Sequence, residues 1–189
     1  MSIDRVSIYR TSTVYAEVLL QAAKDRGIIL ELSGQLTRIL SLIRGNVELR
    51  DVLTDRVIPA ETRANVAREV FAGFDEALVG MFGVMVERED IFLLDRVNET
   101  YVELAEKELD SLILDVTTVV ELDDDLRASI KKKYSAQCGR DVLLREHIDP
   151  ALVGGLVLSA HGRRIDASVV SQLENARVVL STVSSGGEG

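Results

Sequence analysis

The chain has 189 residues, which is enough for one medium domain or two small ones. Its 22 basic and 31 acidic residues give a formal net charge of -9, which argues against a nucleic acid or an anionic membrane surface as its partner. Hydrophobic residues make up 47% and aromatic residues 4%, so we expect a core of aliphatic side chains. The single cysteine, Cys138, cannot form an intramolecular disulfide, which fits a reducing compartment.

Apolar residues at three- and four-residue spacing run through residues 4–112 and predict one helix after another. The first predicted helix ends at Gly27 and the second near Gly45–Asn46. The first helix carries an apolar stripe made of Val14, Val18 and Ala22 together with Tyr15, Leu19 and Ala23.

Four further helices complete this region. A short one is expected around Leu49, and Pro59 is expected at the first position of the next. The fifth runs from Asp75 to about Glu87, and the sixth starts at Asp90. Short helices joined by tight turns predict a six-helix bundle over residues 1–111.

The pattern changes near Leu112, where apolar residues begin to alternate with polar ones as in a strand. A helix is predicted from Asp123 to Gln137, because acidic residues at its start and basic ones near its end suit the helix dipole. Gly139 ends this helix, and Asp141–Ile148 is the second predicted strand.

The segment from His147 to Val170 is predicted to hold a turn, a strand and the start of a helix. Gly154–Gly155 follow Asp149, and a short apolar strand then runs from Leu156 towards Gly162. Arg163 and Arg164 mark an expected exposed corner, and Ser168 an expected helix cap. The predicted fold is mostly α with a small α+β part: a β-α-β-β-α domain over residues 112–183, and a flexible tail over 184–189.

The residue patterns of catalysis are missing from this sequence. It has neither a phosphate-binding loop motif nor a dinucleotide fingerprint. His147 and His161 have no second histidine or cysteine at metal-ligand spacing, and Asp123–Asp125 are expected to be capping charges. We therefore expect no catalytic residues, no cofactor and no metal.

No signal peptide is expected at the N-terminus. The longest apolar run, Ala77 to Val86, is about half the length of a membrane-spanning helix. If the protein acts at a membrane, we expect another chain to hold it there.

Two glycines lie inside the apolar fifth helix, and each costs about 1 kcal/mol relative to alanine. Ala77, Gly80, Gly83 and Val84 share one helix face. Such a smooth face lets another helix approach closely. From the residues alone, that helix is either one of the protein's own or one of a partner.

Both ends of the chain resemble the delta subunit of F-type ATP synthases, the bacterial counterpart of the mitochondrial oligomycin-sensitivity-conferring protein. Tyr15–Ala16 and the apolar stripe behind them are similar to the first helix of that family. The C-terminal match is made of Ile148–Asp149, Leu152, Gly154–Gly155, Val157, Gly162, Ile165–Asp166 and Ser168. Two matches at the separation found in the family cover nearly the whole chain.

The resemblance implies a non-catalytic stator subunit that joins the alpha/beta catalytic head to the peripheral stalk, so that proton-driven rotation yields ATP. It implies a groove between helices one and five for the N-terminal helix of an alpha subunit, and a C-terminal domain that faces the C-terminal ends of the b subunits. The location it implies is the cytoplasmic face of the bacterial plasma membrane. The implied groove residues are Tyr15, Ala16, Val18, Leu19, Ala22, Gly80, Gly83, Val84 and Glu87, and the implied structural turn is Asp149, Gly154 and Gly155.

The chain departs from the family in two places. Thr13–Val14 stands where the family usually has Arg-Pro, and Arg88–Glu89–Asp90 replaces an Asn-Gly-Arg-like turn. The alternative functions are a small α/β enzyme whose Gly-Gly turn holds an anion, and a generic helical adaptor.

Overall fold

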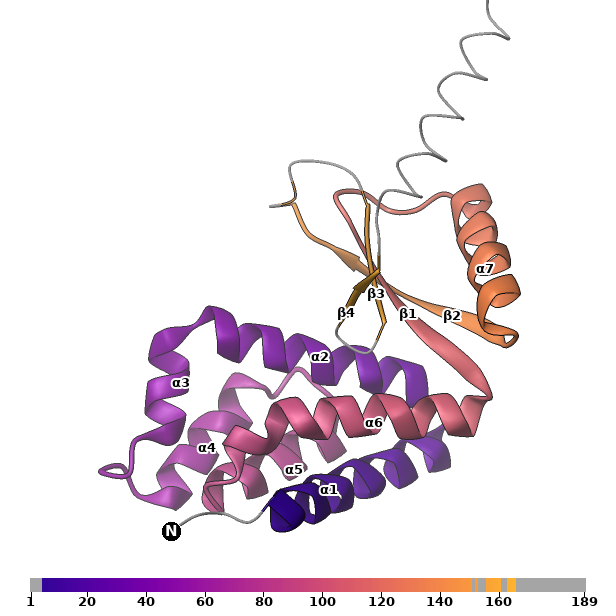
Figure 1. Ribbon diagram of the computed structural model, residues 1–189. Helices are drawn as coiled ribbons and strands as arrows, with labels where there is room; N and C mark the ends of the chain where they lie inside the picture. The colour runs from indigo at the N-terminus through magenta and orange to yellow at the C-terminus, as the bar shows by residue number, and fades with distance from the viewer. Residues whose placement is uncertain (1–4, 151, 153–155, 161–162, 166–189) are drawn as a thin grey trace, which may run out of the picture. The chain divides into compact units, whose positions relative to one another are not determined.

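The computed structural model describes residues 5–150, 152, 156–160 and 163–165 (Figure 1). These residues form two compact units, Met1–Leu109 and Asp110–Gly189, here called the helical unit and the sheet unit. The described residues contain seven α-helices and a small mixed sheet, so this part of the chain is mostly helical.

The helical unit contains the six helices that the apolar spacing predicted. Helix α1 spans Arg5–Arg26, α2 Ile29–Gly45 and α3 Val47–Thr54. Helix α4 spans Ala60–Val70 and α5 Glu76–Glu87. A short 3-10 turn, η1, at Ile91–Leu93 leads into α6, Leu94–Leu109.

Local chemistry explains where these helices start and stop. Gly27 has φ +68°, a left-handed conformation that glycine adopts readily, so the chain turns there after α1. Asn46 caps α3 by accepting a hydrogen bond from the Leu49 amide at 2.9 Å. Pro59 is the residue before α4 rather than its first residue, which corrects the predicted position by one.

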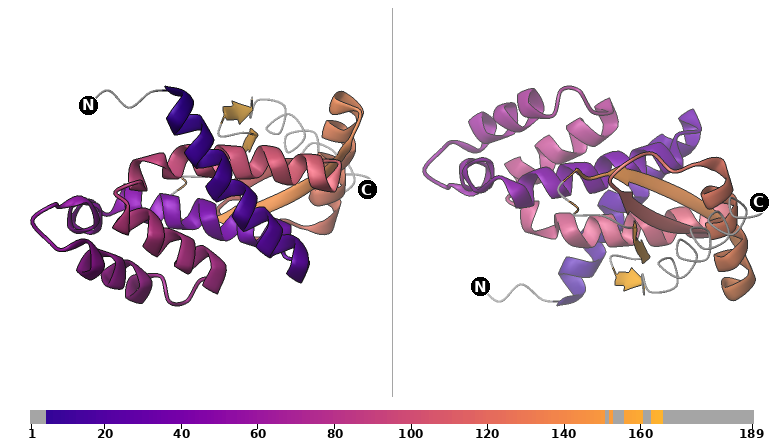
Figure 2. Two further views of the ribbon diagram at one scale, coloured as in Figure 1. Left: turned by 90° about the horizontal axis from the view of Figure 1, so that it is seen from below. Right: turned by 90° about the horizontal axis from the view of Figure 1, so that it is seen from above.

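The core of the helical unit is aliphatic, with a few large rings. Helix α1 lies across α6, as the view from below shows (Figure 2), and α4 packs on α5. Phe71 and Phe82 meet edge to face with ring centroids 5.1 Å apart. The largest fully buried side chains in this unit are Tyr101, Phe71, Phe82, Leu19, Leu32, Leu36, Ile39, Leu53, Leu78 and Met85.

The sheet unit is built on a parallel crossover followed by antiparallel strands. Strand β1 is Ser111–Thr118, α7 is Asp124–Cys138 and β2 is Asp141–Ile148; β3 is Leu156–Ala160 and β4 is Arg163–Ile165. The strand order is β2-β1-β3-β4. Strands β1 and β2 are parallel, whereas β1 with β3 and β3 with β4 are antiparallel.

Alternation along β1 decides which face of the sheet carries the core. Leu114 and Val116 pack with Ile130 and Tyr134 of α7. Asp123 caps α7 by accepting from the Leu126 amide at 2.7 Å, and Gly139 ends the helix at φ +69°. The core cluster consists of Leu114, Val116, Leu122, Ile130, Tyr134, Val142, Leu156 and Leu158.

The final segment differs from its prediction in one respect. Arg163 and Arg164 belong to β4, which pairs with β3, so they do not form the expected corner. The predicted closing helix after Ser168 lies outside the described residues, as do Gly154 and Gly155.

Candidate partner-binding surface

Helices α1 and α5 are joined by two polar contacts, one near each end of α5. The Tyr15 hydroxyl donates to Asp90 Oδ2 at 2.8 Å, just beyond the end of α5. Arg26, in the last turn of α1, binds Asp75 at the start of α5 through Nη1–Oδ2 at 2.6 Å and Nη2–Oδ1 at 2.7 Å. Because the end of α1 meets the start of α5, while the middle of α1 meets the residues after the end of α5, the two helices are antiparallel.

The two contacts also place residues along the pair. Both helices rise about 1.5 Å per residue. The two helices can therefore be aligned by counting residues inward from each contact. Val18 then lies level with residues 83–87, and Ala22 lies level with residues 79–83. The C-terminal half of α1 therefore lies beside α5.

Apolar side chains remain exposed on this helix pair. Val14 is 57% exposed and Val18 60% exposed on α1, while Val84 is 40% exposed on α5. Gly80 is also exposed, and a Cβ atom added to it would meet nothing within 4 Å. The surface offers apolar contacts together with a place where another backbone can approach α5 closely.

The residues that the resemblance assigned to a groove fall into three groups. Val18, Gly80, Val84 and Glu87 are exposed. Tyr15 and Ala22 are half-buried, and Ala16, Leu19 and Gly83 are buried inside the bundle. The first group is available to a partner directly, whereas the buried group supports the surface from beneath.

Gly83 illustrates why sequence spacing alone could not separate these groups. A Cβ atom added to it would lie 2.8 Å from Arg68 Nε, because the Arg68 side chain of α4 covers this glycine. Arg68 in turn pairs with Glu87 through Nη2–Oε1 at 2.6 Å. Gly83 thus makes room for a partly exposed ion pair between α4 and α5, while Gly80 faces open space.

The contacts between the two helices shift the titration of the groups that make them. Burial and the hydrogen bond to Asp90 raise the pKa of Tyr15 to about 12. The hydrogen bonds from Arg26 hold the pKa of the Asp75 carboxyl below its ordinary value, and the Ala77 amide, 3.0 Å from Oδ1, adds to this effect. Asp75 therefore caps α5 and pairs with α1 at the same time.

One end of the helix pair opens into a pocket of about 220 Å³. It is lined by residues from α1, from the loop before α4 and from the turn after α5, and it combines charged with apolar side chains. The lining residues are Ser7, Ile8 and Thr11; Arg56; Arg88, Glu89 and Asp90; and Phe92 and Leu93.

An ion-pair group beside this pocket was not foreseen from the sequence. Glu89 has φ +60°, an uncommon conformation for a residue with a side chain. Its carboxylate pairs with Arg56 at 2.9 Å and with Arg63 at 3.4 Å. Arg63 is only 3% exposed. A buried arginine on an otherwise polar helix gives no sequence signal, since its burial depends on the neighbouring helices.

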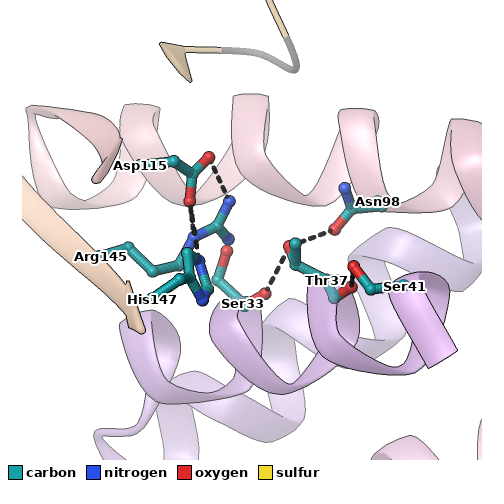
Figure 3. A network of polar contacts seen from close by, with 7 residues as sticks. All are labelled: Ser33, Thr37, Ser41, Asn98, Asp115, Arg145 and His147. Atoms are coloured by element: carbon teal, nitrogen blue, oxygen red, sulfur yellow. Dashed lines mark hydrogen bonds and ion pairs between the residues drawn. The ribbon is translucent and has the colours of Figure 1, made fainter. Parts of the chain in front are cut away.

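The sheet unit has a polar group of its own, drawn in Figure 3. Arg145 Nη2 donates to Asp115 Oδ2 at 2.8 Å and Nε to Oδ1 at 2.5 Å, while His147 Nε2 lies 3.2 Å from Oδ1. Asp115 and Arg145 are partners in the β1–β2 register. Burial works against the charged carboxylate, but the hydrogen bonds from His147 and Arg145 outweigh it and keep the pKa of Asp115 below its ordinary value.

Each unit also has a smaller polar contact between neighbouring elements. In the helical unit, the Thr37 hydroxyl lies 3.1 Å from Ser33 O and 3.1 Å from Asn98 Oδ1 (Figure 3). In the sheet unit, the Asp149 amide donates to Thr118 O at 2.8 Å, which fixes the chain after β2. Both features tie neighbouring elements within one unit.

Within the described residues, no group of three or more His, Cys, Asp or Glu side chains is arranged to hold a metal ion. No helix in the same part of the chain is both long and apolar enough to cross a bilayer. What the described geometry offers is a clamped helix pair with exposed apolar side chains. Apolar side chains on a fixed helix pair form a surface on which another helix can pack.

Comparison with known proteins identifies the family. Residues 11–180 match the family model of the ATP synthase delta (OSCP) subunit. ATP synthase subunit delta of Prochlorococcus marinus strain MIT 9515 is 30% identical over 172 residues, covering 90% of this chain and 96% of the relative. The same subunit of strain MIT 9303 is 29% identical over 175 residues, covering 92% of this chain and 96% of the relative.

A solved structure agrees at the level of the fold. A chain in the cryo-EM structure of the Toxoplasma gondii mitochondrial ATP synthase hexamer superposes with a TM-score of 0.53 at 16% identity, covering 89% of this chain and 96% of that one. The chain belongs to the ATP synthase delta (OSCP) subunit family. It is a non-catalytic stator component of F-type ATP synthase, the complex that couples proton transport to ATP synthesis. This membership rules out the two alternative functions, a small α/β enzyme and a generic helical adaptor.

Proposed function

We propose that the surface between α1 and α5 binds the N-terminal helix of an alpha subunit of the catalytic head, and that the sheet unit binds the C-terminal ends of the b subunits. In this arrangement the protein joins the head to the stalk at the cytoplasmic face of the bacterial plasma membrane. Such a joint keeps the head from turning with the rotor, so that rotation is converted into ATP synthesis.

The observation that carries the first half of this proposal is the exposure of Val18 and Val84 on two helices clamped side by side. Helix-in-groove recognition needs apolar anchors at helical spacing and a groove that keeps its shape. The two polar contacts supply the fixed shape. The exposed valines and Gly80 supply the anchors and the close approach.

The nine expected groove residues then take different roles. Val18, Gly80, Val84 and Ala22 make the direct contacts, and Val14 extends them along α1. Glu87 forms a polar rim that is held by Arg68. Tyr15 sets the helix spacing, while Ala16, Leu19 and Gly83 shape the surface from below.

The test is titration of a peptide carrying the alpha-subunit N-terminal helix onto the full chain, followed by calorimetry. We expect Val18→Glu to weaken binding about thirtyfold, since burying a charge at an interface anchor typically costs about 2 kcal/mol or more. Val52→Glu is the matched control, because Val52 is an exposed valine on α3, far along the chain from both α1 and α5. Equal losses in the two variants would contradict the assignment of the surface.

The second half of the proposal is tested with the same variants. A soluble fragment of the b subunits is titrated onto the wild type and onto Val18→Glu. Because the two units are separate compact bodies, we expect b binding to be unchanged when head binding is lost. Parallel loss of both activities would show that one unit carries both contacts.

A further inference from the structure

An ion-pair cluster at the end of the α1–α5 surface holds one more positive than negative charge. Arg56 and Arg88 line the pocket together with Glu89 and Asp90, and the buried Arg63 reaches Glu89 from outside the lining. Three guanidinium groups, from Arg56, Arg63 and Arg88, share two carboxylates, Glu89 and Asp90. This is unexpected in a chain whose net charge is -9. With Arg63 included, the ion-pair cluster at the pocket therefore has a positive excess of one charge on an acidic protein.

The existing pairs leave the arginines incompletely satisfied. Arg63 is buried, yet its contacts to Leu53 O and to Glu89 Oε1 are both 3.4 Å long, and its Nε has no hydrogen-bond partner among the described residues. Buried charges are normally paired at close range. Arg88 lies 3.6 Å from Asp90 Oδ2, beyond hydrogen-bond distance.

The arginine side chains at the rim are exposed to solvent, although both have an acidic neighbour. The side chains of Arg56 and Arg88 are 81% and 69% exposed. Beside them lie apolar residues, among which Phe92 is 53% exposed. A ligand that fits this pocket has a carboxylate next to an apolar side chain, a combination that a peptide segment offers.

The pocket continues the surface already described. Thr11 lies one turn before Tyr15 on α1, and Arg88 directly follows Glu87 on α5. One end of a helix bound against Val18 and Val84 therefore lies near Arg56, Arg88 and Phe92.

We propose that this pocket is a second anchor for the same partner, and that it takes an acidic side chain from the segment flanking the groove-bound helix. The inference rests on the proposed function, because the segment is placed there by the helix. The partner's carboxylate pairs with Arg56 and Arg88, and its neighbouring apolar side chain packs on Phe92.

The experiment compares three peptides on the full chain. The first is limited to the alpha-subunit N-terminal helix. The second adds the flanking segments on both sides, and the third is identical to the second except that every Asp and Glu outside the helix is replaced by its amide. We expect the second to bind at least about fivefold more tightly than the third at low salt, and the difference to shrink as salt is raised.

The protein variants locate the effect. Arg56→Gln with Arg88→Gln removes two positive charges at the pocket, and we expect it to bind the second and third peptides equally. Arg44→Gln with Arg50→Gln removes the same charge from exposed positions on α2 and α3, and we expect it to keep the difference. Unchanged binding of the helix-only peptide to the pocket variant verifies that the groove is still folded.

The outcomes separate the two proposals. If the second and third peptides bind the wild type equally while Val18→Glu weakens both, the pocket inference is overturned and the groove stands. The inference is also overturned if the two double variants lose the same affinity for the second peptide. If none of the three peptides binds, the proposed function fails, and the second anchor fails with it.

Discussion

Arg26 and Asp75 form a two-point ion pair that joins the last turn of α1 to the residue capping α5, with N–O distances of 2.6 and 2.7 Å. The Asp75 side chain is 12% exposed. The same carboxylate accepts a hydrogen bond from the Ala77 amide. The Asp75 side chain thus both caps α5 and pairs with Arg26, and two substitutions distinguish these contributions.

Asp75→Asn keeps a good helix cap but removes the charge, whereas Asp75→Ala removes both. We expect the alanine variant to be less stable than the asparagine variant by about 1 kcal/mol, the usual contribution of a cap. Urea unfolding followed by circular dichroism at neutral pH measures this difference. Equal stability of the two variants would show that the side chain acts only through Arg26.

The ion pair also predicts a dependence on pH. Because the pKa of Asp75 is lowered in the folded protein, its contribution to stability is present above the ordinary aspartate value of about 4 and is lost as pH falls below it. We expect wild-type stability to fall more steeply below this pH than that of Asp75→Asn. Parallel acid curves for the two proteins would contradict the assignment.

The two glycines of α5 are expected to respond differently to the same substitution. Gly80→Ala gains about 1 kcal/mol of stability, because a helical glycine is replaced where nothing obstructs a Cβ atom. Gly83→Ala gains less, because its Cβ atom displaces the Arg68 side chain from Glu87. Thermal unfolding of both variants provides the comparison.

A third substitution checks the cause of that difference. In an Arg68→Ala background the obstructing side chain is absent, so we expect Gly83→Ala to raise stability by as much as Gly80→Ala does. A double-mutant cycle gives the coupling between the two positions directly. Additive effects would mean that Arg68 moves without cost.

The Asp115–Arg145 pair of the sheet unit is expected to behave as a buried ion pair. Asp115→Leu leaves the Arg145 guanidinium without its carboxylate and destabilises the unit by about 3 kcal/mol. Arg145→Met in the same chain removes the guanidinium that has lost this carboxylate, and we expect the double variant to be more stable than Asp115→Leu alone. Amide hydrogen exchange in β1 and β2 reports on this unit separately from the helical one.

The Tyr15 hydroxyl offers a spectroscopic test of the other helix contact. Its pKa of about 12 means that the folded state holds the proton more tightly than the unfolded state, so stability is lost as pH rises above about 10. Tyr15→Phe removes the hydrogen bond to Asp90 and costs about 1 kcal/mol at neutral pH. In an alkaline absorbance titration, the component near pH 12 decreases in this variant; an unchanged curve would place Tyr15 in an ordinary environment.

The sequence by itself determined the elements and most of their ends. Periodicity of about 3.6 and of about 2 residues reflects which side chains face a core, so it predicted six helices and then a strand. Asn46, Asp75 and Gly139 act on backbone groups within a few residues of themselves. Such local effects can be predicted from the sequence, because the interacting groups are close together in the chain. The family, too, could be predicted from motifs at the two ends of the chain.

Only the tertiary structure decided which apolar residues remain outside. Val18 and Leu19 are neighbours on one predicted stripe, yet one is 60% exposed and the other is fully buried. Gly80 and Gly83 differ in the same way, because Arg68 reaches over only one of them. When an apolar stripe is wider than the area that neighbouring helices cover, the residues at the edge of the stripe stay exposed. Which residues these are depends on the position of the neighbouring helices. Burial and ion pairing depend on residues that are far apart in the chain. The ion pair of Glu89 with Arg63 and the neighbouring pocket could therefore be seen only in the folded protein.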